Sequence, residues 1–220
     1  TRWDNVGAMR NRGVEINVSA DVLRIKDFTW NVNANVSYNK NEITELYNGI
    51  TEYVASDTGR MVAVGHPLGE FYLNRYAGVN PTNGDALWYT KDGEITTEYN
   101  ESDKVMLGKT HEAPWQGGFG TTLSWQGFSL SAQFTWVADR WMLNNDRVFQ
   151  ESNGLFSAYN QSKRMLYDRW KKPGDVTDIP RYGVTPQLDS RFLEDASFLR
   201  LKNLMLSYTC LLYTSPSPRD

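Results

Sequence analysis

The chain has 220 residues, a formal net charge of −3 and a hydrophobic content of 40%. This charge excludes a nucleic-acid partner, because no basic stripe is available to replace the counterions of phosphate groups. No apolar run approaches the roughly 18 residues that a membrane-spanning helix needs, and the single cysteine, Cys210, excludes an intrachain disulfide and a thiol metal cluster.

Two strands are predicted near the start of the chain, at residues 13–22 and 28–38. Both alternate apolar and polar side chains with a period of two, and the short connection at residues 23–27 predicts an antiparallel hairpin. The apolar positions are Val14, Ile16, Val18, Ala20 and Val22 in the first strand and Phe28, Trp30, Val32, Ala34, Val36 and Tyr38 in the second.

A second pair of strands is predicted at residues 119–125 and 128–136, with a turn at Gln126 and Gly127. Its second strand places Phe134 and Trp136 on the apolar face. The section between the two hairpins is less regular. Residues 68–79 and 85–90 are predicted to form one more pair of crossing strands, and the alternative is that the whole section is one extracellular excursion.

The last strand begins near Ala196 and changes phase along its length. Leu199 and Leu201 fall on one face, whereas Leu204 and Leu206 fall on the other. One extra residue near Lys202 or Asn203 reconciles the two halves, which predicts a β-bulge there.

The spacing of aromatic residues favours a membrane-embedded sheet over a soluble β-sandwich, which has the same alternation and remains the alternative. Trp30 and Tyr38 lie eight residues apart on one apolar face, as do Phe128 and Trp136. That spacing is about 26 Å along a strand and about 20 Å after a tilt of about 40°, close to the apolar band of about 25 Å between the aromatic girdles of an outer-membrane barrel. The residues expected to face lipid are Val14, Val18, Trp30, Val32, Tyr38, Phe134 and Trp136.

The lengths of the connections agree with this interpretation. The turns at residues 23–27 and 126–127 are tight, whereas residues 40–67 and 138–190 form long loops. Outer-membrane barrels have short periplasmic turns and long extracellular loops. We therefore predict an all-β fold, an antiparallel transmembrane β-barrel fragment of about seven strands.

No catalytic set, cofactor site or metal site is expected. His66 and His111 have no cysteine or carboxylate at ligand spacing, and Asp175 with Asp178 suits turn capping better than acid–base chemistry. The sequence around Asp92 lacks the acids of a calcium loop. Gly117, Gly118 and Gly120 precede no Lys-Ser/Thr pair, so they indicate a bend or close packing rather than a phosphate cradle.

The long loop at residues 138–190 is expected to contact cargo or a partner protein. It carries Trp141, Tyr167 and Trp170, whose rings suit stacking on a ligand, and its prolines and glycines limit the entropy lost on ordering. The alternative is architectural: Tyr167 and Trp170, with Leu166, form the buried face of a short helix.

Several ordered blocks resemble the C-terminal barrel of the SusC/RagA family of TonB-dependent outer-membrane transporters. They include NRGVEINVSADV, GHPLGEFY, AGVNPTNGDALWY, PGDVTDIPR and FLEDASFLRLKNLMLSYT. The resemblance implies location in the outer membrane of a Gram-negative cell, coupling to the TonB complex, a SusD-like lipoprotein partner, and import of a glycan or peptide cargo. It also implies a non-enzymatic protein whose N-terminal plug and final strands are not found here.

Two domain-level expectations follow. Residues 1–209 are expected to be a partial outer-membrane β-barrel, and residues 210–220 read like the translated adapter of a sequencing library. Two functions from other classes remain open: a secreted glycan-binding or glycan-cleaving β-sandwich, and a passive outer-membrane pore.

Overall fold

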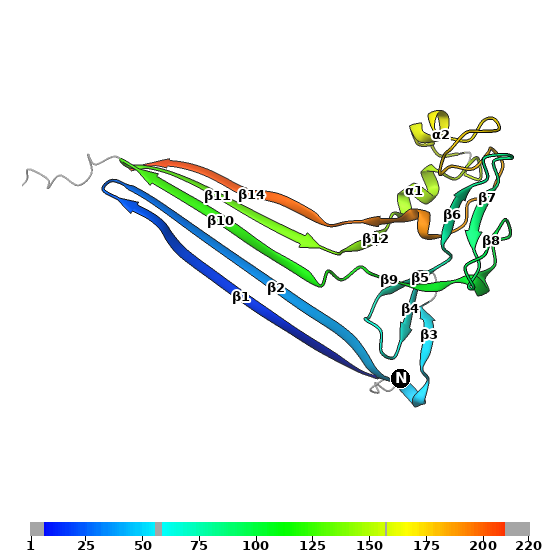
Figure 1. Ribbon diagram of the computed structural model, residues 1–220, viewed down its shortest axis with the longest axis horizontal. Coiled ribbons are helices and arrows are strands. Elements are labelled where there is room, and N and C mark those ends of the chain that lie inside the picture. Colours follow the sequence, from blue (N-terminus) through cyan, green and yellow to red (C-terminus); the bar gives the residue numbers. More distant parts are fainter. Residues whose placement is uncertain (1–6, 56–58, 157, 210–220) are drawn as a thin grey trace, which may run out of the picture. The chain divides into compact units, whose positions relative to one another are not determined.

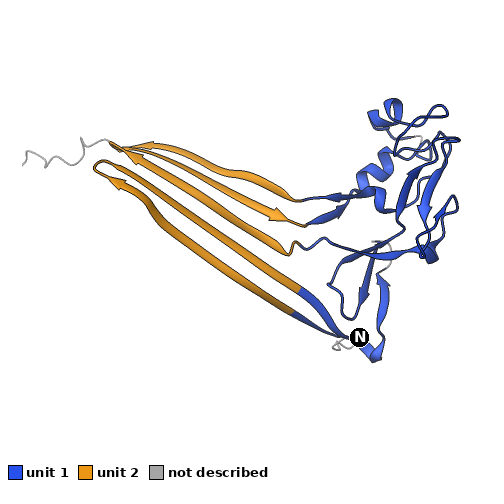
Figure 2. Ribbon diagram, viewed as in Figure 1, with its two compact units in different colours: residues 1–10, 41–112, 140–196 blue, residues 11–40, 113–139, 197–220 orange. Residues whose placement is uncertain are grey.

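The computed structural model describes residues 7–55, 59–156 and 158–209. The tail at residues 210–220, expected to be foreign, lies outside the described residues. The chain divides into two compact units (Figure 2). Unit 1 contains the described residues of 1–10, 41–112 and 140–196, and unit 2 those of 11–40, 113–139 and 197–220.

Unit 2 is built on one five-stranded antiparallel sheet with the order β1-β2-β10-β11-β14 (Figure 1). Its strands are β1 (Gly7–Ile25), β2 (Phe28–Leu46), β10 (Trp115–Trp125), β11 (Phe128–Ala138) and β14 (Phe198–Tyr208), and the ends of β1 and β2 run on into unit 1. The four strands predicted from strict alternation are confirmed, and each extends further than predicted. The last strand is confirmed too, but it begins at Phe198 rather than near Ala196.

The β-bulge in the last strand is confirmed. Gln133 pairs with Asn203 while the next residue, Phe134, pairs with Leu201. Lys202 is therefore the extra residue, and it restores the apolar residues of both halves of β14 to one face.

The two ends of this sheet differ in how the chain connects them. At one end, two-residue turns join β1 to β2 and β10 to β11. Both residues of the second turn have positive φ, 46° at Gln126 and 87° at Gly127, as in the type I′ turn that matches strand twist. At the other end the chain leaves for residues 41–112 and 140–196. This asymmetry confirms the predicted pattern of tight turns and long loops.

The predicted crossing pair in the middle section is wrong. Residues 68–90 contain β5 (Glu70–Leu73), β6 (Tyr76–Val79) and β7 (Ala86–Tyr89), and each has four residues. A strand needs about 9–11 residues to cross a membrane. Asn74 and Arg75, which break the alternation, separate β5 from β6. The sheet of unit 2 accordingly has five long strands rather than about seven, as the alternative of one excursion requires.

Unit 1 contains three small sheets, with the orders β3-β4-β5-β9, β6-β7-β8 and β12-β13. Its remaining elements are η1 (Tyr47–Gly49), β3 (Glu52–Ala55), β4 (Arg60–Ala63), β8 (Ile95–Thr96), η2 (Glu101–Asp103), β9 (Val105–Thr110), β12 (Trp141–Leu143), α1 (Asn145–Gln150), α2 (Lys163–Tyr167), η3 (Ser190–Phe192) and β13 (Leu193–Asp195). None of the described helices has the length and hydropathy of a membrane-spanning helix.

Unit 1 has its own small core, in which both long excursions take part. Phe71 and Leu73 of β5 pack on Leu193 of β13, and Trp141 and Leu188 cover them. A second cluster joins the end of β2 to β4. The long loops therefore fold into a defined structure instead of remaining extended.

Candidate functional site

The sheet of unit 2 has one continuous apolar face. Residues paired across antiparallel strands share a face, so the register assigns each row of side chains. The central rows of the apolar face are Trp30, Leu123, Leu130 and Leu206; Val32, Thr121, Ala132 and Leu204; Ala34, Phe119, Phe134 and Leu201; and Val36, Gly117, Trp136 and Leu199. No described element of unit 2 covers this face, and Leu206, for example, is 71% exposed.

Aromatic rows border the apolar face at both ends. At the hairpin end, Phe28, Trp125, Phe128 and Tyr208 occupy one register row, and the rings of Phe128 and Tyr208 lie 4.5 Å apart. At the opposite end Tyr38 pairs with Trp115, also at 4.5 Å between ring centroids. Positions 28 and 38 are about 33 Å apart along a strand, or about 25 Å after a tilt of about 40°. The rows therefore bracket a band as tall as the apolar belt of an outer-membrane barrel.

The opposite face is polar and rich in amides and hydroxyls. Its rows include Asn31, Thr122 and Ser131, then Asn33, Gly120, Gln133 and Asn203. Thr122 bonds Ser131 at 3.4 Å and Ser124 bonds Ser129 at 3.2 Å. This composition suits a hydrated surface.

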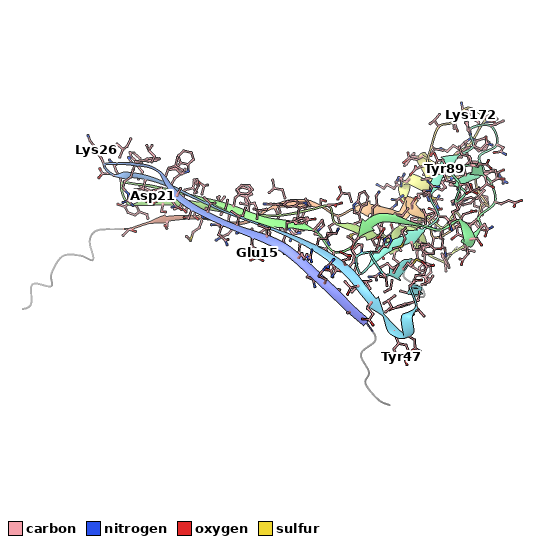
Figure 3. All side chains as sticks on the ribbon, turned by 60° about the horizontal axis from the view of Figure 1, so that its bottom comes forward. Glu15, Asp21, Lys26, Tyr47, Tyr89 and Lys172 are labelled. Atoms are coloured by element: carbon pink, nitrogen blue, oxygen red, sulfur yellow. The ribbon has the colours of Figure 1, made fainter. Side chains whose placement is uncertain are left out.

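All seven residues expected to face lipid lie on the apolar face. The register places Trp30, Val32, Tyr38, Phe134 and Trp136 there directly. For β1, the hydrogen bond of 3.5 Å from Ser37 to Glu15 puts Glu15 on the polar face, so alternation puts Val14 and Val18 on the apolar one. Figure 3 shows Glu15 and Asp21 along β1 and Lys26 at its hairpin end. Contact with lipid itself stays a prediction.

The glycines of β10 serve close packing, one of the two roles predicted for them. A Cβ added at Gly117 would overlap the carbonyl oxygen of Asn35 and come within 2.9 Å of the Trp136 ring. At Gly120 it would overlap the side-chain amide of Gln133. Large side chains of β11 thus lie over bare backbone of β10.

The structure separates the three loop aromatics that were expected to contact cargo or a partner. Trp141 packs on the Phe71 cluster, and the Lys109 ammonium lies 3.4 Å from its ring centroid. Trp170 donates from Nε1 to the Pro81 carbonyl at 3.2 Å. Tyr167 is 70% exposed. Only Tyr167 of the three therefore presents most of its side chain to solvent.

The predicted buried helix face of Leu166, Tyr167 and Trp170 is wrong. The helix α2 ends at Tyr167, its buried residue is Met165, and Leu166 is 62% exposed. The Ser162 hydroxyl caps the helix by accepting from Arg164 N. Trp170 therefore lies beyond the end of the helix, and Met165 is the residue that α2 buries.

An arginine–carboxylate network ties the second excursion together. One of its pairs, Arg147 with Glu151, has the i,i+4 spacing of a helical ion pair. Glu151 is 3% exposed and accepts from Arg147 at 3.0 and 3.2 Å and from Arg164 at 2.8 Å. Arg147 also reaches Glu194 at 2.7 Å, and that partner lowers the pKa of the Glu194 carboxyl. The pairs link α1, α2 and β13.

The two aspartates of the PGDVTD turn have structural partners. Asp178 accepts two bonds of 2.7 Å from Arg164. Asp175 accepts from the backbone N–H groups of Lys171 and Lys172, and the bond from Lys171 is the main reason that its pKa is lowered. This agrees with capping rather than acid–base chemistry.

A buried aspartate joins the two excursions, and sequence analysis missed it. Asp189 is fully buried, accepts from Trp88 Nε1 at 2.8 Å and from Arg191 N at 2.9 Å, and forms a β-bridge with Asn74. Burial raises the pKa of the Asp189 carboxyl, against the opposing effect of Arg191.

His66 does have a carboxylate partner, contrary to expectation. Its Nδ1 lies 2.9 Å from Glu70 Oε2, and Glu70 is buried with its other oxygen accepting from Gly108 N at 2.7 Å. The four-residue spacing of His66 and Glu70 was the available signal. Over the described ranges, no three His, Cys, Asp or Glu side chains are grouped to hold a metal ion.

The chain is similar to several known proteins, although no family model matches it. Two curated relatives are TonB-dependent receptor P3 of Formosa agariphila, 26% identical over 93% of this chain, and TonB-dependent receptor SusC of Bacteroides thetaiotaomicron, 25% identical over 93%. The chain covers 22% and 21% of those two proteins.

Solved structures of the RagAB transporter match in three dimensions. The RagAB peptide transporter is 36% identical, with a TM-score of 0.90 over 98% of this chain and 25% of the matched chain. The RagAB peptide importer in its open-open state is 38% identical, with a TM-score of 0.85 over 94% of this chain and 23% of the other. The chain thus spans about a quarter of the length of the proteins it matches. Over nearly its whole length the chain is similar in sequence and in structure to TonB-dependent receptors such as SusC and to the RagAB transporter.

Proposed function

We propose that this chain is part of a TonB-dependent transporter that imports oligosaccharides or peptides across the outer membrane of a Gram-negative cell. The observation that carries the proposal is the amphipathic sheet of unit 2, whose apolar face is bounded by two aromatic rows. A face of that height needs lipid around it, and the polar face then lines a hydrated interior. The named relatives, receptors and transporters, support a transport role over an enzymatic one.

In this proposal residues 1–209 supply one sector of the barrel wall and its extracellular loops. The two outer strands of the sheet, β1 and β14, each have one edge that no described strand pairs. Further strands of the same barrel satisfy those edges, because an open edge is not tolerated in lipid. Residues 210–220 are proposed to be foreign to the transporter. The plug and the TonB-binding segment belong to other parts of the polypeptide.

The cargo class is a glycan or a peptide. RagAB is described as a peptide importer, and SusC is another relative of this chain. The RagAB comparison supports a peptide, and we propose a glycan as the other candidate. We also propose that a SusD-like surface lipoprotein closes over the extracellular opening as the transporter's partner.

The second excursion offers a surface for cargo or that lipoprotein. Its exposed large apolar side chains include Leu155, Tyr159, Leu166, Tyr167, Val176 and Tyr182. The same excursion contains the buried residues Glu151, Ser152 and Asn153, whose side chains are hydrogen-bonded. Exposed apolar groups in an ordered loop are typical of binding surfaces. Trp141 and Trp170 are proposed to support this surface, and Tyr167 to make contact.

A matched pair of substitutions tests that contact. In the full-length transporter, Tyr167→Ala removes an exposed ring, whereas Met165→Ala removes a buried side chain of the same helix. We expect Tyr167→Ala to lower cargo uptake at unchanged surface abundance, and Met165→Ala to lower abundance. Unchanged uptake in Tyr167→Ala contradicts the contact role.

Uptake in cells tests import itself. Cells that lack the full-length transporter, and cells complemented with it, are given labelled oligosaccharides and peptides, with and without an uncoupler of the proton-motive force. Import through a TonB-dependent transporter predicts uptake that needs both the transporter and the proton-motive force. Uptake that persists with the uncoupler indicates a passive pore, and hydrolysis without uptake indicates a secreted enzyme.

A further inference from the structure

The polar face of the unit 2 sheet carries positive charge on one outer strand, β14, and acids on the other, β1. Residues 28–38, 115–125, 128–138 and 198–208 contain no aspartate or glutamate, and their only charged residues are Arg200 and Lys202. Neither has an ion pair among the residues that the structure describes. The acids within the strands of the sheet, Glu15 and Asp21, are four strands away on β1, or about 19 Å at the usual strand spacing. Asp139, which directly follows β11, is four residues from Thr135, the partner of Arg200, or about 13 Å along a strand.

The β-bulge concentrates this charge. Arg200 pairs with Thr135 and therefore lies on the polar face, and Asn203 pairs with Gln133 on the same face. Because Lys202 is the extra residue of the bulge, it lies beside Asn203 in the lining of one hollow instead of alternating away from it. Without the bulge, either Lys202 or its neighbours would point to the apolar face.

The missing side chains of β10 leave room at the same place. A hollow of about 490 Å³ is lined by Asn35, Gly118, Gln133, Thr135, Lys202 and Asn203. At Gly118 only backbone forms its floor. Asn35, Gln133 and Asn203 surround the hollow with amide groups, and each amide offers two N–H donors.

We infer that this hollow binds a carboxylate. The inference rests on the proposed function only in taking the polar face as the transporter's interior. An ammonium group surrounded by amide donors, with no carboxylate among the described residues of the lining, is complementary to a carboxylate, which accepts up to four hydrogen bonds. The Arg200 guanidinium lies over the Phe198 ring, 4.9 Å from its centroid, and adds positive charge to the same strand. The carboxylate comes from cargo, such as a peptide C-terminus or a uronic acid, or from an acidic side chain elsewhere in the polypeptide.

Binding by the purified full-length transporter distinguishes these sources. The probes are hexaalanine with a free C-terminal carboxylate against its amide, and trigalacturonate against its methyl ester. If the hollow binds cargo, at least one of the two acids binds about tenfold more tightly than its neutral counterpart. Lys202→Gln and Arg200→Gln reduce this affinity ratio, and high salt reduces it as well. The control Lys26→Gln removes the same charge at the hairpin turn and leaves the ratio unchanged.

Thermal melting of the same proteins tests whether the carboxylate comes from the polypeptide itself. If an acidic side chain of the polypeptide occupies the hollow, Lys202→Gln lowers the melting temperature more than Lys26→Gln does, and the probe ratio stays near one. If Lys202→Gln and Arg200→Gln change neither the probe ratio nor the melting temperature relative to Lys26→Gln, the inference is overturned. Failure of wild-type cells to import any cargo counts against the proposed function. The binding and melting measurements on the purified protein can still be interpreted in that case.

Discussion

At the scale of single residues, Asp189 is the buried charge that joins the two excursions of unit 1. Its raised pKa means that the folded chain holds the proton more tightly than the unfolded chain does. The stability that it contributes is therefore fully present below the ordinary Asp pKa and is lost as pH rises through the raised value, by about 1.4 kcal/mol for each pKa unit of elevation.

The substitution Asp189→Asn tests this dependence because it preserves shape and an acceptor for Trp88 Nε1. Calorimetry of the full-length transporter from about pH 4 to about pH 8 should show wild-type stability falling relative to that of the variant. A constant difference between the two proteins across this range would mean that Asp189 keeps an ordinary pKa.

Glu151 is the second residue with a large predicted effect. Glu151→Gln leaves the guanidinium groups of Arg147 and Arg164 without their buried counter-charge. Because both arginines are partly solvated, we expect a loss of roughly 2–3 kcal/mol, below the full cost of breaking a buried pair.

The control for Glu151 is Glu101→Gln, which breaks the solvent-exposed pair with Lys104. Its cost should stay below about 1 kcal/mol. The free energy of unfolding of the loops is measured for both variants by denaturant titration, with protease cleavage reporting the unfolded fraction. An equal loss of unfolding free energy in the two variants would show that the buried network stabilises the loops no more than a surface ion pair does.

At the scale of secondary-structure elements, the packing of β10 against β2 and β11 depends on Gly117. An added methyl group there meets the Asn35 carbonyl and the Trp136 ring, and backbone cannot move aside cheaply. Gly117→Ala should therefore lower the amount of folded transporter in the outer membrane several-fold, measured by heat-modifiable migration on gels.

Gly120→Ala is the matched variant in the same strand. There the three atoms nearest to the added methyl group belong to the end of the Gln133 side chain, which can rotate away. Near-normal assembly is expected, and assembly as poor as that of Gly117→Ala would indicate that flexibility of β10, rather than close packing, is what both glycines provide.

Elements with strict alternation could be predicted from sequence, and those in the excursions could not. The faces of β2 and β11, the turn at Gln126 and Gly127, and the bulge at Lys202 follow from a period of two and from local turn chemistry. The four-residue strands β5, β6 and β7 instead depend on contacts between distant residues, such as Asn74 with Asp189. Asp189 and Glu151 were missed because Trp88 and Arg164, which donate to them, lie 101 and 13 residues away in the sequence.

At the scale of the whole molecule, the unpaired edges of β1 and β14 limit what the chain can do alone. Residues 1–209 expressed without the rest of the barrel should aggregate in water. The reason is that both strand edges have unpaired backbone groups and the apolar face is exposed. Circular dichroism during heating checks this. A sharp cooperative melt without detergent would favour the soluble β-sandwich.

The central claim is that one face of this sheet contacts lipid and the other does not. Spin labels at Val32 and Ala132 on the apolar face, and at Asn31 and Ser131 on the polar face, test it in the full-length transporter reconstituted in bilayers. A lipid-soluble quencher should reach the first pair strongly and the second pair weakly. Equal quenching of the two pairs, or stronger quenching at Asn31 and Ser131, would contradict the assignment of faces and the membrane-spanning barrel built on it.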